Sequence, residues 1–207
     1  WHGKHSMSQI LVTYSTLSGS TVEVAEAIRD ELSLSGHEVD LHPVAEPVDI
    51  EQYDAIVVGG PMILGWHREA RRFIRKNRPL LKGIPFAVFA TAMSLTNTDR
   101  TEISGVPVFI DENLPKIPED PVRLSIRERY ATIQNYVSPI LRIARPEKPV
   151  SVALFGGRLN YGRLKWWALL FAMLIVREEA GDKRNWEAIR GWARALPIQM
   201  GLQHNEV

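Results

Sequence analysis

The residues that decide the fold are Gln9-Ile10-Leu11-Val12-Thr13-Tyr14, followed by Ser15-Thr16-Leu17-Ser18-Gly19-Ser20-Thr21. The first six are mostly apolar and include β-branched residues, a composition typical of a strand buried on both faces of a parallel sheet. The next seven form a polar loop with one glycine, and the stretch from Thr21 to Ser35 that follows has apolar residues at helical spacing. A buried strand, a hydroxyl-rich loop and a helix together predict the first unit of an α/β fold.

The same alternation continues along the chain. Further strands are predicted at residues 37–41, 53–60, 85–91 and 150–155, and further helices at residues 68–77, 122–137 and 186–196. Five strands alternating with helices predict a doubly wound α/β sheet. A long insertion, at about residues 96–149, precedes the last strand, and within it only residues 106–110 resemble a strand. We expect residues 7–207 to form a single domain, after a cloning remnant at residues 1–6.

Composition excludes several classes of protein. The 25 basic and 24 acidic side chains leave a formal charge of +1, which argues against nucleic-acid binding by phosphate neutralisation. Cysteine is absent, so disulfides, thiolate nucleophiles and iron–sulfur clusters are excluded. No spacing of His, Asp and Glu indicates a metal site. The longest apolar run, residues 166–176, is shorter than the roughly 18 residues that cross a bilayer, and no secretory signal precedes it, so we expect a cytoplasmic protein of undetermined oligomeric state.

In a doubly wound sheet, ligands bind outside the carboxyl ends of the strands. The loop from Ser15 to Thr21 offers hydroxyls, backbone N–H groups and the positive end of a helix dipole to a phosphate. It lacks the Gly-Lys-Ser/Thr of a Walker loop and the Gly-x-Gly-x-x-Gly of a dinucleotide site. With no lysine or arginine, the loop suits a phosphate monoester held by uncharged donors. The alternative is a polar turn that caps a helix.

The loop from Gly59 to His67 is apolar where a plain turn would be polar. Its glycines and Pro61 bring the backbone close to a planar ligand, on which Trp66 is expected to stack. The alternative is that its central residues only close the top of the sheet. His67, directly after this loop, is a candidate proton relay, and an exposed surface histidine is the alternative.

The loop from Thr16 to Thr21 resembles the flavodoxin phosphate loop, Thr/Ser-x-Thr/Ser-Gly-x-Thr. The resemblance implies the strand order 2-1-3-4-5, with flavin mononucleotide (FMN) at the carboxyl edge. Residues 59–67 and 155–167, and Asn185-Trp186-Glu187, are similar to the menaquinone-dependent protoporphyrinogen dehydrogenase family. The FMN contacts implied for the phosphate are Thr16, Leu17, Ser18, Gly19, Ser20 and Thr21, and those implied for the isoalloxazine are Pro61, Met62, Ile63, Leu64, Gly65, Trp66, Thr91, Ala92, Met93 and Ser94.

This resemblance implies an FMN-dependent oxidoreductase that oxidises a protoporphyrinogen-like or other hydrophobic substrate with a quinone as acceptor. The flavin would carry the chemistry, so the sequence indicates no catalytic side chain beyond the candidate His67. The nearly neutral chain, with Arg68, Arg71 and Arg72 after the second loop, favours a fully reduced anionic flavin and hence two-electron transfer. The alternatives are an FMN electron-carrier flavodoxin and an NAD(P)H:quinone reductase.

The segment from Arg158 to Arg177 combines an apolar run with paired tryptophans and basic residues. One interpretation is a wholly buried helix, and the other is a surface that meets a hydrophobic substrate or lies on a membrane at its inner face. Under the second interpretation the contacts come from Arg158, Arg163, Lys165, Trp166 and Trp167.

Overall fold

The computed structural model describes residues 7–17, 19–63, 65–96, 100–118, 120, 122–159 and 181–202. Its main sheet has seven strands. In spatial order these are β2 (Glu38–Pro43), β1 (Gln9–Tyr14), β3 (Ala55–Pro61), β4 (Phe86–Ala92), β9 (Ser151–Gly156), β7 (Val106–Ile110) and β6 (Glu102–Ile103). All neighbouring pairs are parallel except β6 and β7. Two small sheets pair β5 (Leu95–Thr96) with β8 (Pro115–Lys116), and β10 (Arg158–Leu159) with β11 (Gly181–Asp182).

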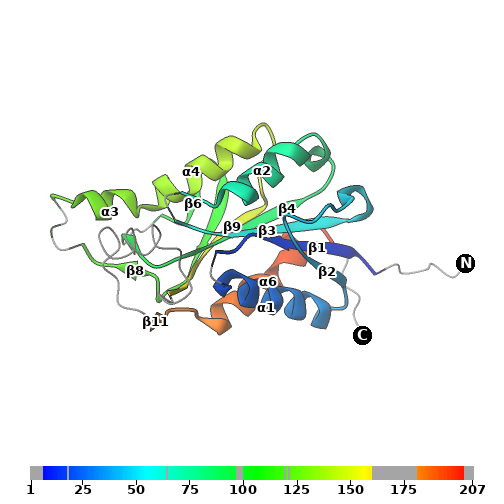
Figure 1. Ribbon diagram of the computed structural model, residues 1–207, viewed down its shortest axis with the longest axis horizontal. Coiled ribbons are helices and arrows are strands. Elements are labelled where there is room, and N and C mark those ends of the chain that lie inside the picture. The colour runs from blue at the N-terminus through cyan, green and yellow to red at the C-terminus, as the bar shows by residue number, and fades with distance from the viewer. Residues whose placement is uncertain are drawn as a thin grey trace, which may run out of the picture.

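Helices cover both faces of the sheet (Figure 1). They are α1 (Ser20–Leu34), α2 (Arg68–Asn77), α3 (Ile126–Tyr130), α4 (Ile133–Ala144) and α6 (Trp186–Gln199), with short 3₁₀ turns η1 (Ile50–Gln52) and η2 (Leu80–Lys82). Helices α1 and α6 lie side by side on one face, and α2 and α4 on the other. The predicted doubly wound architecture is therefore confirmed.

The core has two layers because side chains alternate along each buried strand. Ile10, Val12 and Phe89 belong to the layer under α1 and α6, together with Trp192. Leu11 and its counterparts on β3, β4 and β9 belong to the layer under α2 and α4. Since both layers are apolar, the central strands read as continuous hydrophobic runs, as the sequence predicted.

The predicted order 2-1-3-4-5 matches β2-β1-β3-β4-β9, but the prediction of five strands is wrong. Strands β7 and β6 extend the sheet beyond β9, and both come from the segment predicted as an insertion. They are joined by a two-residue turn at Ser104 and Gly105, whose φ angles are 55° and 77°. Positive φ at both central positions gives a turn whose twist matches that of a hairpin.

The prediction of a single helix at residues 122–137 is also wrong. The chain forms α3 and α4 instead, and each has its own amino-terminal cap. Ser125 and Glu128 make a reciprocal capping box for α3, and Thr132 accepts from the N–H of Asn135 to cap α4. Two caps seven residues apart satisfy orphan N–H groups in two places, so the chain breaks between them.

Candidate functional site

The first loop leaves β1 at the carboxyl edge of the sheet and enters α1. Gly19 is the N-cap of α1 with φ 89°, and its N–H donates to Thr16 Oγ1 at 2.9 Å. Among the described residues no side chain caps this helix. The N–H groups of its first turn, at Ser20 and Thr21, therefore face a position where an anion would be stabilised by the helix dipole.

A buried hydrogen bond connects this loop to the end of β4. Thr21 Oγ1 and Thr91 Oγ1 are 3.2 Å apart, and both side chains are nearly inaccessible to solvent. The two residues were predicted to touch different parts of one ligand. Their contact brings the first and third predicted loops together at one edge of the sheet, while Ser18 lies outside the described residues.

The second loop is a tight hairpin. Met62 and Trp66 form an antiparallel bridge, and the Ile63 N–H donates to the Gly65 carbonyl at 3.0 Å. The Met62 N–H donates to the Thr91 carbonyl at 2.8 Å, so this loop also lies beside the end of β4. Leu64 is outside the described residues.

Trp66 does not present its ring at the surface. Trp66 is only 3% exposed, and its indole lies over Gly60, where an added Cβ would be 3.1 Å from Nε1. Glycine at this position leaves room for the ring to enter the core. The stacking role predicted for Trp66 does not fit this burial, because a ring already packed in the core has no free face for a planar ligand.

His67 follows the hairpin as the N-cap of α2. Its Nδ1 is buried and has no hydrogen-bond partner among the described residues. Burial lowers the pKa of His67 below its ordinary value, so the imidazole is mainly neutral at pH 7. In a neutral imidazole one ring nitrogen carries a proton and the other a lone pair, so His67 stays a candidate proton relay.

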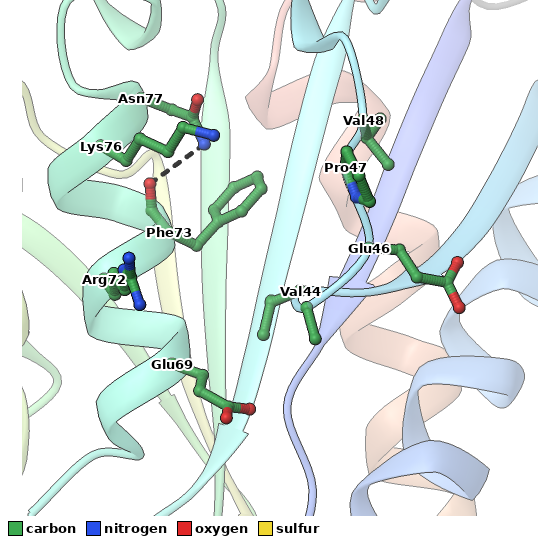
Figure 2. A pocket seen from close by; sticks show the side chains of 10 residues that line it. Val44, Glu46, Pro47, Val48, Glu69, Arg72, Phe73, Lys76 and Asn77 are labelled. Carbon is green, nitrogen blue, oxygen red and sulfur yellow. Dashed lines mark hydrogen bonds between the residues drawn. The ribbon is translucent and has the colours of Figure 1, made fainter.

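Of the basic residues after the second loop, Arg72 lies away from the loop. Arg72 lines a pocket of about 420 Å³ between α2 and the loop after β2, with Phe73, Lys76 and Glu46 (Figure 2). None of the predicted ligand contacts lines this pocket. Arg72 is therefore a poor source of positive charge for a flavin at the three loops.

The third loop, residues 92–94, is held by its carbonyl groups. The Ala92 carbonyl accepts from the Gly157 N–H at 2.8 Å, and the Ser94 carbonyl accepts from the Tyr136 hydroxyl at 3.1 Å. Between them, the Met93 carbonyl accepts from Lys183 Nζ at 3.1 Å.

Sequence reasoning identified none of these donors, two of which are side chains, those of Tyr136 and Lys183. Tyr136 lies in α4, and its ring contacts Tyr130 edge to face with centroids 6.1 Å apart. Tyr130 lies near the backbone of Gly65 in the second loop, and burial raises the pKa of its hydroxyl. Both donors come from far along the chain, and no local motif links them to residues 92–94.

Arg158, the first residue of the segment from Arg158 to Arg177, belongs to an ion-pair network. Glu23 in the first turn of α1 accepts from Arg158 at 2.6 Å and from Arg184 at 2.7 Å. Arg184 also bonds to Asp182 and lies over the Trp186 ring, 4.5 Å from its centroid. The Arg184 hydrogen bonds are the main cause that lowers the pKa of both Glu23 and Asp182. The charge of Arg158, predicted to meet a lipid or substrate, is thus paired with Glu23 here.

The other predicted tail contacts, Arg163, Lys165, Trp166 and Trp167, lie outside the described residues. Within the part of the chain that the structure describes, no helix is long and apolar enough to cross a membrane. In the same residues no group of three His, Asp or Glu side chains is arranged to hold a metal ion.

Residues 11–185 match the sequence profile of the flavodoxin domain. The chain belongs to the flavodoxin family. It is also 23% identical over 198 residues to protoporphyrinogen IX dehydrogenase [quinone] of Escherichia coli K12, covering 90% of this chain and 93% of that protein.

Solved flavodoxin structures are similar to parts of the chain. The two-electron reduced flavodoxin of Megasphaera elsdenii is 12% identical, with a TM-score of 0.46 over 70% of this chain and 84% of that one. A mutant flavodoxin of Fusobacterium nucleatum bound to flavin mononucleotide is 20% identical, with a TM-score of 0.37 over 42% of this chain. That match spans 52% of the Fusobacterium protein.

Proposed function

We propose that this flavodoxin-family protein binds FMN at the three loops and is a quinone-linked oxidoreductase for a hydrophobic, protoporphyrinogen-like substrate. The observation that carries the proposal is the start of α1 at Gly19, which no described side chain caps and which has the Thr16 hydroxyl beside it and the Thr21–Thr91 hydrogen bond to β4. Uncharged donors at a helix start suit a phosphate monoester. The Escherichia coli relative, named for a quinone acceptor, supports the reaction class.

The residues present fit FMN in two further respects. The second loop supplies an apolar wall, with Ile63 partly exposed, and the third loop lies beside it through the Met62–Thr91 hydrogen bond. When bound, the flavin supplies two-electron transfer between substrate and quinone. The chain's own part is to hold the phosphate, to orient the ring between the second and third loops, and to hold a proton at His67 Nδ1.

FMN binding is tested by adding apoprotein to FMN and following flavin fluorescence. We expect quenching with the wild-type protein and at least tenfold weaker binding with Gly19→Val, because a β-branched residue disfavours φ 89° by about 1–2 kcal/mol and blocks close backbone approach. The matched control is Gly83→Val, since the glycine lies at an exposed turn after η2 with no positive φ. No quenching by the wild-type protein would refute the proposed site.

The reaction class is tested by reductive titration and by quinone turnover. We expect reduction in one two-electron stage and reoxidation by a soluble quinone. A one-electron-reduced form that accounts for most of the flavin, without quinone turnover, would instead indicate an electron carrier. Direct bleaching by NAD(P)H would indicate the nicotinamide-linked quinone reductase.

We include a peripheral membrane contact in the proposal, because hydrophobic substrates and quinones concentrate there. Three aliphatic side chains near α3 support it, since Ile117, Val122 and Ile126 are 83%, 96% and 84% exposed. Co-sedimentation with anionic vesicles should fall for Ile117→Ser/Ile126→Ser and for Trp166→Ser/Trp167→Ser. The exposed pair Leu34→Ser/Ile198→Ser, on α1 and α6, is the control. Equal sedimentation of all variants would remove this contact from the proposal.

A further inference from the structure

Among the described residues, three groups hold residues 92–94 by their carbonyls, and Lys183 is the charged one. Its partners in that role are a backbone N–H, from Gly157, and a neutral hydroxyl, from Tyr136. The Lys183 ammonium thus brings a formal positive charge within 3.1 Å of the Met93 carbonyl oxygen.

The backbone of Lys183 is fixed close to the end of β9. Its N–H donates to the Gly157 carbonyl at 3.0 Å. Gly156 permits this approach, because an added Cβ would lie 1.9 Å from the Lys183 carbonyl oxygen. The side chain is partly buried. A flexible lysine is therefore anchored at both ends, and its charge stays at the third loop.

Three other cations of the chain have different contacts. Arg158 and Arg184 are paired with carboxylates, and Arg72 lines the pocket beside α2. The sequence had assigned the flavin's positive surroundings to the arginines of α2. Lys183 donates a hydrogen bond directly to a carbonyl of the third loop, so we place the positive charge there instead.

We propose that Lys183 sets the two-electron reduction potential of the flavin by stabilising negative charge on the isoalloxazine beside residues 92–94. The inference rests on the proposed function. Two electrons and one proton from the substrate leave one negative charge on the ring at neutral pH, and the second proton goes to solvent. A cation in a partly buried position stabilises that charge more than it would in water.

The test separates charge from hydrogen bonding with three variants. Lys183→Gln retains a donor without charge, Lys183→Met removes both, and Lys183→Arg retains both. The readouts are the dissociation constant of oxidised FMN, by fluorescence quenching, and the two-electron potential, by equilibration with a reference dye. Lys148→Gln is the matched control, because Lys148 Nζ also donates to a carbonyl, that of Ser104 at 2.8 Å, at the opposite end of β9.

We expect Lys183→Gln and Lys183→Met to bind oxidised FMN within about threefold of the wild-type protein. Reduced FMN should bind about tenfold more weakly, which lowers the two-electron potential by about 30 mV. Lys183→Arg and Lys148→Gln should keep the wild-type potential.

Two results would overturn the inference while leaving FMN binding intact. One is an unchanged potential in both neutral variants, and the other is a potential that changes in Lys183→Met but not in Lys183→Gln, since the hydrogen bond alone would then act. If the wild-type protein binds no FMN, the proposed function fails, and this inference fails with it.

Discussion

Replacing Gly156 with alanine tests the closest backbone approach at the carboxyl edge. The added methyl group would lie 1.9 Å from the Lys183 carbonyl oxygen and 2.6 Å from its carbonyl carbon. Neither atom belongs to a flexible side chain, so the strand end and residues 182–184 must separate. Overpacking of this kind costs about 1–3 kcal/mol, and backbone displacement puts Gly156→Ala near the upper end, at about 3 kcal/mol.

Equilibrium urea unfolding measures this cost. With a slope of about 2–3 kcal/mol/M, a loss of about 3 kcal/mol lowers the unfolding midpoint by roughly 1–1.5 M. Gly191→Ala is the matched control, since this exposed helical glycine has nothing within 4 Å of an added Cβ. The same substitution there should stabilise the protein by about 0.5–1 kcal/mol through helix propensity. A free energy of unfolding for Gly156→Ala within about 0.5 kcal/mol of the wild-type value would refute the close approach.

Three further predictions concern stability and titration. Glu23→Gln should make the free energy of unfolding less dependent on pH in the acid range. The pKa of Glu23 is lowered in the folded protein, so its contribution to stability is present above about pH 4.5 and is lost as the pH falls through the folded pKa. Urea midpoints from pH 7 to pH 3 measure this, and the same pH dependence in the variant and the wild-type protein would contradict it. Trp192→Phe should cost about 1–3 kcal/mol, because it leaves the buried Ser151 hydroxyl without its 3.0 Å donor, and a thermal melt unchanged within about 1 °C would count against that bond. Burial, with help from the hydrogen bond to Asp40, raises the pKa of Tyr53 to about 12, so Asp40→Asn should lower the pH at which Tyr53 ionises, as difference absorbance against Tyr53→Phe would show.

Much of the fold follows from short-range patterns. Helix α2 has the bounds predicted from the sequence, residues 68–77, and so does β7, residues 106–110. The boundary between α3 and α4 could not be predicted from apolar spacing, because two caps compete with one continuous helix. Helix α4 also runs through Pro139 to Ala144, since Ile140 and Leu141 beyond the proline are buried against the sheet.

The candidate site, like the fold, could be predicted from the sequence only in part. The position of its loops follows from the rule that ligands bind at the carboxyl ends of parallel strands. The burial of Trp66 could not be foreseen, because the space above Gly60 depends on how α2 packs. Lys183 escaped prediction because its contact with Met93 joins residues 90 positions apart.

The two edge strands of the main sheet, β2 and β6, affect how the protein behaves at high concentration. An unpaired edge strand can pair with a strand of a second molecule, which is a route to aggregation. One edge strand, β6, is only two residues long, so it offers few backbone N–H and C=O groups for such pairing. On the other side β2 carries exposed Glu38 and Asp40, and a second copy would bring its own carboxylates against them. The hairpin turn at Ser104 and Gly105 thus places the two-residue β6, rather than the five-residue β7, at the outer edge of the sheet.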